Sequence, residues 1–332
     1  MLSNVLKRKS VLFIGVEFYH YHLEIHRKME HYGANVTFYS ERDTSIKYGI
    51  VNRLFPKWLD KFQQSHYSSI LKNIKGQTFD YLLVIRGYKM PLWFVQAIKK
   101  NNPNIKTIMY QWDANVNSPF LDLPPNYNVI DEFDRKFSFD YRDVEDHPAL
   151  LKYSPTFYTD EIKDLAHQTE RNVIYDFFYF GSYLPERYEG LLRFKTYVEL
   201  HGYSLKTHFY MPLRYYLIER LKGTKLDSKL LSYKKMKREV YIDLLQKSKA
   251  IVDVSNAKQT GMAMRVIDAL GAGKKILTTN KWITRDENCE LNQIVIIDMK
   301  NISIPSGFLE TKVQPVKFDF SIDKWLYNMF CS

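Results

Sequence analysis

Cysteine is nearly absent from this sequence, with only Cys289 and Cys331 among 332 residues. Two isolated cysteines supply neither a disulfide framework nor the spacing of a metal site. Long apolar runs are also missing, because no stretch approaches the roughly 20 residues that a membrane-spanning helix requires. The apolar run at 11–16 follows basic residues and lacks a small-residue cleavage site, so it predicts a β-strand and not a signal peptide. We therefore expect a cytoplasmic protein.

Basic residues outnumber acidic residues in this sequence, by 48 to 37, which gives a formal net charge of +11. This balance favours an anionic partner, which could be a nucleotide, a phospholipid surface or a nucleic acid. No recognition helix, zinc motif or RNP-like motif accompanies the charge, so we do not expect nucleic-acid binding. The length and the hydrophobic content of 45% allow two globular domains, each with its own core.

Short apolar runs alternate with amphipathic stretches along the first half of the chain. The expected strands are 11–16, 35–39, 81–86 and 106–111, and the expected helices are 20–32 and 92–101. Between 118 and 160 this pattern gives way to proline-rich and polar sequence, so we place the domain junction near 155–172.

A second alternating series follows the junction. Its expected elements are strand 174–181, helix 185–201, strand 205–210, helix 239–247, strand 250–254, helix 262–270, and strands 275–279 and 293–297. The predicted fold class is α/β, with two doubly wound Rossmann-like domains facing a central cleft. The predicted domains are 1–160 and 161–310, followed by an amphipathic tail, 311–332, that packs back on the first domain.

The stretch QTGMAMRVIDALGAGKKILTTN, residues 259–280, is the most informative part of the sequence. It follows a predicted strand, so its loop lies at the carboxyl edge of a sheet, where ligands of such sheets bind. Gly261 lets an anion approach the backbone at a helix N-terminus. Arg265 and Asp268 share one helix face, where the guanidinium can hold a diphosphate and the carboxylate a ribose diol. The alternative is a plain ion pair within the helix.

This stretch resembles the nucleotide-sugar signature of GT-B fold glycosyltransferases, in particular the CgeB-like transferases of capsule and lipopolysaccharide biosynthesis. In that group a Q-x-G-x-x-x-R-x-x-E-A-L-G pattern recurs, and Asp268 stands here in place of its glutamate. The segments DFFYFGSYLPERYEGLLRF and YQWDANVNSP also resemble parts of the family. The resemblance implies that 1–160 is the acceptor side and 161–310 the nucleotide-sugar side. It further implies a donor-binding site formed by Gly181, Ser182, Arg187, Gln259, Thr260, Gly261, Met262, Arg265 and Asp268. It also implies a metal-independent enzyme without a cofactor, because arginines, lysines and helix dipoles stabilise the leaving diphosphate in GT-B enzymes.

An inverting transferase needs a group that takes the proton from the acceptor hydroxyl. Asp113, after a predicted strand, is our first candidate, and its alternative role is a helix or turn cap. Glu17 and His20 follow the first strand and are further candidates. His20 and His22 do not form a metal pair, because side chains at i and i+2 do not converge on a helix. The remaining strand-end candidates, for acceptor or phosphate contacts, are Arg86, Lys89 and Trp112. A retaining enzyme would need no dedicated base.

The segment 222–238 carries seven basic residues and one acidic residue. It is either a solvated surface or a contact with an anionic membrane leaflet. We therefore expect a glycosyltransferase that moves a sugar from a nucleotide-sugar donor to a surface glycan or its lipid-linked precursor. Such an enzyme would work in the cytoplasm, at the inner face of the plasma membrane. The alternatives are a non-catalytic sugar-nucleotide-binding or scaffold protein of a polysaccharide locus, and a basic nucleic-acid-binding protein.

Overall fold

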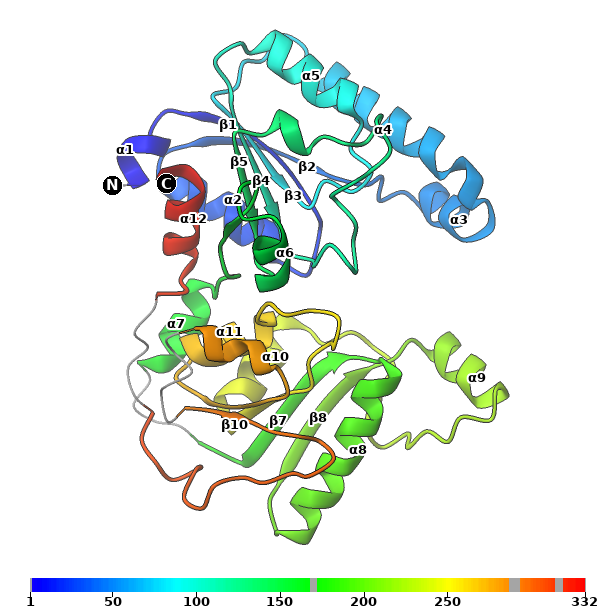
Figure 1. Cartoon of the computed structure of the whole chain (residues 1–332), viewed down its shortest axis with the longest axis vertical. Coiled ribbons are helices and arrows are strands. Elements are labelled where there is room, and N and C mark those ends of the chain that lie inside the picture. Colours follow the sequence, from blue (N-terminus) through cyan, green and yellow to red (C-terminus); the bar gives the residue numbers. More distant parts are fainter. Residues whose placement is uncertain (1, 168–171, 287–292, 314–318, 332) are drawn as a thin grey trace. The chain divides into compact units, whose positions relative to one another are not determined.

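Two parallel β-sheets, each with six strands, organise the chain, and helices pack on both faces of each sheet (Figure 1). The structure, a computed structural model, describes residues 2–167, 172–286, 293–313 and 319–331. Unit 1 comprises Met1–Pro155 and Ile322–Ser332, and unit 2 comprises Thr156–Ser321. The chain therefore leaves unit 1, forms unit 2 and returns to unit 1 for its last helix.

Unit 1 has the strand order β2-β1-β3-β4-β5-β6. Its strands are β1 (Ser10–Gly15), β2 (Asn35–Ser40), β3 (Tyr81–Ile85), β4 (Lys106–Gln111), β5 (Arg135–Ser138) and β6 (Lys152–Tyr153). Its helices are α1 (Leu2–Leu6), α2 (Tyr21–His31), α3 (Ile46–Leu54), η1 (Pro56–Trp58), α4 (Leu59–Asn73), α5 (Leu92–Asn101), η2 (Ile130–Glu132), α6 (Tyr141–Asp146) and α12 (Ile322–Cys331). The chain runs outward from β1 to β2 and then crosses back to β3, so the topological switch point lies between β1 and β3.

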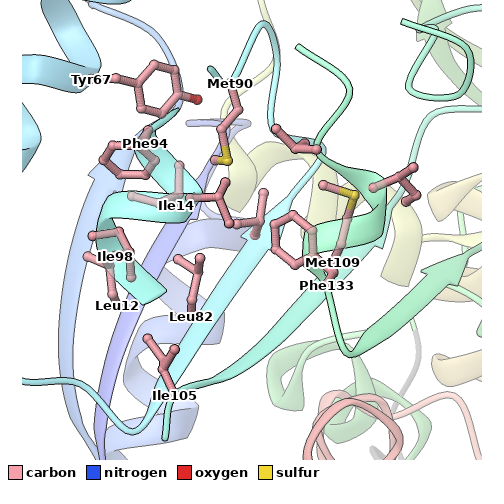
Figure 2. Packing of buried hydrophobic residues seen from close by; sticks show 14 of the residues in the cluster. Leu12, Ile14, Tyr67, Leu82, Met90, Phe94, Ile98, Ile105, Met109 and Phe133 are labelled. Carbon is pink, nitrogen blue, oxygen red and sulfur yellow. The ribbon is translucent and has the colours of Figure 1, made fainter. Parts of the chain in front are cut away.

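The core of unit 1 lies between the sheet and helices α4 and α5 (Figure 2). Leu12 and Leu82 point from β1 and β3 toward Phe94 and Ile98 of α5, and all four are almost inaccessible to solvent. Alternate residues of each strand face this layer, as the two-residue period of a strand requires. Burying each such side chain stabilises the unit by about 1.5–3 kcal/mol.

Helix α12 covers the opposite face of the same sheet. Its Trp325 ring meets Tyr110 of β4 edge to face at 5.0 Å, and Phe330 meets Tyr81 of β3 in the same way. Arg135 of β5 donates from Nη1 to the Met329 carbonyl oxygen at 2.8 Å. The last helix of the chain is therefore part of the core of unit 1.

Unit 2 has the strand order β12-β11-β10-β7-β8-β9. Its strands are β7 (Tyr175–Ser182), β8 (Leu205–Tyr210), β9 (Leu231–Ser232), β10 (Ser248–Asp253), β11 (Lys275–Thr278) and β12 (Ile294–Ile296). Its helices are α7 (Asp160–Ala166), α8 (Pro185–Leu200), α9 (Leu213–Leu221), α10 (Arg238–Gln246), α11 (Met264–Gly271) and η3 (Lys281–Arg285). In order of appearance this is the 3-2-1-4-5-6 arrangement of dinucleotide-binding folds, with its switch point between β7 and β10. Helix α8 packs on one face of this sheet, and α7, α10 and α11 pack on the other.

The structure confirms the predicted fold class of two doubly wound α/β sheets. Each strand and helix expected from the sequence is present, most of them within two residues of the expected limits. One start needs correction, because α11 begins at Met264 and not at Met262. The region 118–160 is more ordered than expected, since it contains β5, α6 and β6. The acceptor and donor roles assigned to 1–160 and 161–310 stay predictions.

The end of the predicted tail is helix α12, and residues 314–318 of that tail lie outside the described part of the chain. Cys289 also lies outside it. Among the residues that the structure describes, no helix combines the length and the apolar character needed to cross a membrane.

Candidate active site

The switch point of unit 2 brings two strand ends together. Strands β7 and β10 are parallel neighbours, so Gly181 and Ser182 at the end of β7 lie beside Asp253 at the end of β10. Carboxyl ends at a switch point are where this fold binds its ligands. The charged side chains that reach this edge therefore define the candidate donor site.

Arg265 of α11 is held at this edge by Asp253. Its Nη1 lies 2.6 Å from Oδ1 of Asp253, and Oδ2 of the same carboxylate accepts a hydrogen bond from Thr278 Oγ1 at 2.7 Å. Both charged side chains are buried, with 10% of Arg265 and 1% of Asp253 exposed. A buried charge is tolerated when it is paired and hydrogen-bonded, so Asp253 fixes the position of the guanidinium.

Arg187, in the first turn of α8, places a second guanidinium at the same edge. Its Nε donates to the carbonyl oxygen of Val254 at 2.9 Å, just beyond the end of β10. Burial lowers the pKa of Arg187, and the positive charge of Arg265 lowers it further. Arginine stays protonated even so, and two partly desolvated like charges repel each other. An anion placed beside both guanidinium groups would relieve that repulsion.

Gly181 leaves room beside these arginines that no other residue would leave. A Cβ atom at this position would lie 2.8 Å from the Tyr179 hydroxyl and 3.4 Å from Nη2 of Arg265. Tyr179 is fully buried, and its hydroxyl has no hydrogen-bond partner among the described residues. Burial raises the pKa of Tyr179, while the charges of Arg265 and Arg187 oppose the rise. The candidate site therefore includes a buried phenol that the sequence did not single out.

The loop before α11 is fixed by a side chain that lies just after β11. Asn280 donates from Nδ2 to the carbonyl oxygens of Thr260 at 2.9 Å and Gly261 at 3.3 Å. Thr260, Gly261 and Met262 are buried, and Gln259 is half-buried. The four loop residues expected to bind the donor thus form an ordered turn after β10.

Asp268 lies apart from the arginine pair in its contacts. Its Oδ2 accepts a hydrogen bond from the Tyr241 hydroxyl of α10 at 2.9 Å and lies 3.7 Å from Nη1 of Arg238. Only 2% of its side chain is exposed. Arg265 pairs with Asp253, whereas Asp268 contacts Tyr241 and Arg238. The two residues that the sequence places at i and i+3 therefore have different partners. The ribose contact of Asp268 stays a prediction.

The carboxyl edge of the unit 1 sheet carries a buried carboxylate that the sequence analysis missed. Glu41 directly follows β2 and is completely buried. Its Oε1 pairs with Nη2 of Arg86, and its Oε2 accepts a hydrogen bond from the Tyr88 backbone N–H at 2.8 Å. In the sequence Glu41 stands in the charged run Glu-Arg-Asp, which is typical of a solvated loop, so only the packing of α4 and β3 distinguishes it.

Arg86 joins Glu41 to Asp113, the predicted base. Its Nη1 lies 3.3 Å from Oδ2 of Asp113, which is 40% exposed. Burial by itself lowers the pKa of Arg86, but Glu41 and Asp113 outweigh it and raise that pKa. The backbone of Arg86 is in the left-handed region (φ 69°), followed by Gly87 (φ 73°). Strain of this kind persists where surrounding contacts hold it, here with Gln111 Nε2 donating to the Arg86 carbonyl oxygen at 2.9 Å.

The remaining predicted residues of unit 1 have separate surroundings. Trp112 packs edge to face with Phe18, with ring centroids 6.1 Å apart, while Glu17 is exposed. His20 precedes α2 and makes no side-chain capping bond to it. Lys89 pairs with Asp60 of α4, and its pKa is raised by that carboxylate against the effect of burial.

Lys89 therefore does not share the cluster of Arg86 and Asp113, and these two are the predicted acceptor-side charges that the structure brings together. No group of three or more histidine, cysteine, aspartate or glutamate side chains suited to a metal ion occurs among the described residues.

Comparisons with solved structures identify the fold of the chain. No protein-family model matches the sequence, and no curated protein matches it either. Solved structures do match. An α-glucosyltransferase in complex with UDP and a 13-mer DNA is 12% identical, with 88% of this chain and 87% of that chain covered and a TM-score of 0.57. A glycosyltransferase from Rickettsia africae is 11% identical, with 97% and 96% covered and a TM-score of 0.56.

A third similar structure is the catalytic domain of starch synthase IV from Arabidopsis thaliana, bound to ADP and acarbose. It is 9% identical, with 91% of this chain and 87% of that chain covered and a TM-score of 0.51. Identities this low carry information on the fold alone. The CgeB-like relationship stays a prediction. The chain has the GT-B fold of glycosyltransferases, as the sequence resemblance predicted.

Proposed function

We propose that the protein is a glycosyltransferase that moves a sugar from a nucleotide-sugar donor to a surface glycan, namely lipopolysaccharide, capsule or a lipid-linked precursor. The observation that carries this proposal is the pair of partly buried guanidinium groups, Arg187 and Arg265, at the carboxyl ends of β7 and β10. A guanidinium fork matches the oxygens of a phosphate, and two forks match a diphosphate. The similar structures described with UDP and ADP support a nucleotide ligand.

The chemistry follows from where negative charge develops. As the sugar leaves, the nucleoside diphosphate gains charge, and fixed positive groups in a desolvated site stabilise it. Arg187 and Arg265 supply that charge from the protein itself, so we propose a reaction without a metal ion. Tyr179 would donate its otherwise unpaired hydroxyl to a phosphate oxygen, while Ser182 and the 259–262 loop would contact the donor. Asp268 would bind the ribose.

The acceptor side of the proposal rests on unit 1. Asp113 would accept the proton of the attacking hydroxyl in an inverting reaction. Trp112 and Phe18 offer aromatic faces of the kind that pack against sugar rings, and Glu17 and His20 lie in the loop after β1. Lys89 is the weaker candidate for an acceptor contact, because Asp60 already holds its charge.

Contact with a membrane is a further part of the proposal. The basic segment 222–238 directly follows α9, a helix with no buried residue. Leu213, Leu217 and Leu221 recur every four residues along it and are all more than half exposed. This combination suits an anionic leaflet and a lipid-linked acceptor.

Nucleotide binding by charge variants tests the donor site. We expect one of UDP, GDP, ADP, dTDP and CMP to raise the melting temperature, and Arg187→Gln and Arg265→Lys to weaken its affinity at least tenfold. The lysine keeps a cation beside Asp253, so the buried carboxylate is not left unpaired. Arg193→Gln, on the exposed side of α8, is the matched control and should bind as the wild type does.

The possible results separate the candidate functions. Binding that is equal in all three variants and the wild type would remove the arginine pair from the donor site. Tight nucleotide binding without turnover of any donor would favour the non-catalytic sugar-nucleotide-binding protein. Steeply salt-dependent binding to DNA or RNA, without a nucleotide response, would favour the nucleic-acid-binding protein.

A further inference from the structure

Large apolar side chains are exposed together where α3 ends and α4 begins. Ile50 is 48% exposed, Leu54 62%, Phe55 49% and Trp58 61%. Every residue from 52 to 58 is exposed. We call residues 50–58 the apolar tip. Exposed apolar side chains that occur singly need no explanation, but a contiguous group marks an interaction site.

The apolar tip is held in place by buried residues on both sides. Tyr48 and Val51 of α3 and Leu59 at the start of α4 are buried against unit 1. Pro56 cannot continue α3, so the chain turns through η1 into α4. The rings of Phe55 and Trp58 stack with centroids 5.6 Å apart. The exposed apolar side chains therefore stand on a turn that is anchored to the unit by buried residues on both sides.

Cations surround the apolar tip. Residues 46–61 contain Lys47, Arg53, Lys57 and Lys61, all exposed, against a single acid, Asp60, which already pairs with Lys89. Figure 1 shows α3 at the outer margin of unit 1, away from the sheet. This composition argues against a protein partner, because lysine is depleted in protein interfaces. Tryptophan flanked by basic residues is instead the pattern of a membrane interface.

We propose that the apolar tip inserts Leu54, Phe55 and Trp58 into the headgroup region of an anionic lipid bilayer, with the surrounding lysines and Arg53 on the lipid phosphates. Ile50 and Leu54 lie one helical turn apart, so α3 would rest its outer side on the surface. The site is distinct from the donor residues and from the basic segment 222–238 of unit 2. It uses only contacts within unit 1.

Sedimentation of the full chain with lipid vesicles tests this proposal. We expect binding to vesicles of phosphatidylcholine mixed with phosphatidylglycerol and much weaker binding to phosphatidylcholine alone. Phe55→Ser with Trp58→Ser should reduce partitioning at least tenfold. Arg53→Glu with Lys57→Glu should also reduce it at least tenfold, since each basic residue near such a surface contributes about fivefold. Leu200→Ser, at a leucine of α8 that is 80% exposed, should bind as the wild type does.

Tryptophan emission gives a second readout. Wild-type emission should shift to shorter wavelength on anionic vesicles, and Trp58→Phe should lose most of that shift while keeping most of the binding. The proposal would be overturned if the wild-type protein did not bind anionic vesicles, or if the serine variants bound them as the wild type does. So would binding lost only in Leu217→Ser with Leu221→Ser on α9, or a concentration-dependent dimer abolished by the serine variants. Nucleotide affinity should be unchanged in every tip variant, so this result and that for the donor site are independent.

Discussion

At the scale of single residues, the two candidate sites share one device, an arginine fixed by a buried carboxylate at a strand end. Asp253 fixes Arg265 in unit 2, and Glu41 fixes Arg86 in unit 1. The outcomes differ, because Arg265 has a second guanidinium nearby, whereas Arg86 has a second carboxylate, Asp113. The first arrangement attracts an anion, and the second holds a carboxylate in position.

Asp113→Asn tests the proposed base. The amide keeps the shape and a hydrogen-bonding oxygen near Arg86, but it cannot accept the acceptor proton. We expect nucleotide affinity to stay within twofold of the wild type and kcat to fall at least a hundredfold, the usual contribution of general base catalysis. The measurement pairs calorimetric nucleotide binding with a transfer assay. Transfer at the wild-type rate would remove Asp113 from this role.

Glu41→Gln tests whether the buried carboxylate positions Arg86 and Asp113. The change removes the buried charge that pairs with Arg86, so the guanidinium is no longer held beside Asp113 as firmly. We expect kcat to fall at least tenfold, while nucleotide affinity stays within twofold of the wild type.

A transfer assay paired with urea unfolding checks the Glu41 prediction, and Asp60→Asn, which removes the partner of Lys89 in the same unit, is its control. A rate that falls only in proportion to the folded fraction would mean that Glu41 acts on stability alone.

At the scale of elements, α12 matters because unit 1 needs it. Its buried face consists of Ile322, Trp325, Leu326, Met329 and Phe330. Asp323 at its start pairs with Lys28 of α2 at 3.0 Å. The helix therefore joins the sheet and α2 in one layer.

Trp325→Ala tests that joint. The indole is 2% exposed and packs on Tyr110, so its loss should destabilise the protein by about 3–5 kcal/mol. Tyr327→Ala on the same helix is the matched control, because Tyr327 is 44% exposed and its loss should cost less than about 0.5 kcal/mol. Urea unfolding measures both changes. Similar losses in the two variants would show that the α12 core face is not decisive.

At the scale of the whole molecule, the fold was predictable where strands are long and apolar. Strands β3 and β4 are buried runs bounded by polar residues, and the sequence marks them clearly. Strands β5 and β6 were not predicted, because they have only four and two residues, begin with a basic residue and lie in a proline-rich region. Helix α4 was not predicted, because its buried face includes the polar residue Gln63. The amide of Gln63 donates hydrogen bonds to carbonyl oxygens only in the folded unit.

The candidate sites were predictable in part for similar reasons. The resemblance pointed to Arg187, Arg265 and Gly181, which the structure brings to one sheet edge. Asp253 reads as part of a strand, so its role as the partner of Arg265 depends on neighbours that the sequence does not reveal. Glu41 was hidden for the same reason, since burial of a lone glutamate after a strand is a tertiary property.

The passage of the chain through unit 2 on its way to α12 sets the order of events during synthesis. Domains usually fold in the order in which they emerge from the ribosome. Here unit 1 must wait, because α12 emerges only after residues 156–321 have done so. Until then the faces of Tyr81 and Tyr110 that α12 covers stay open to water. The nascent chain can therefore complete unit 2 before unit 1 receives its last helix, although all six strands of the first sheet have already emerged.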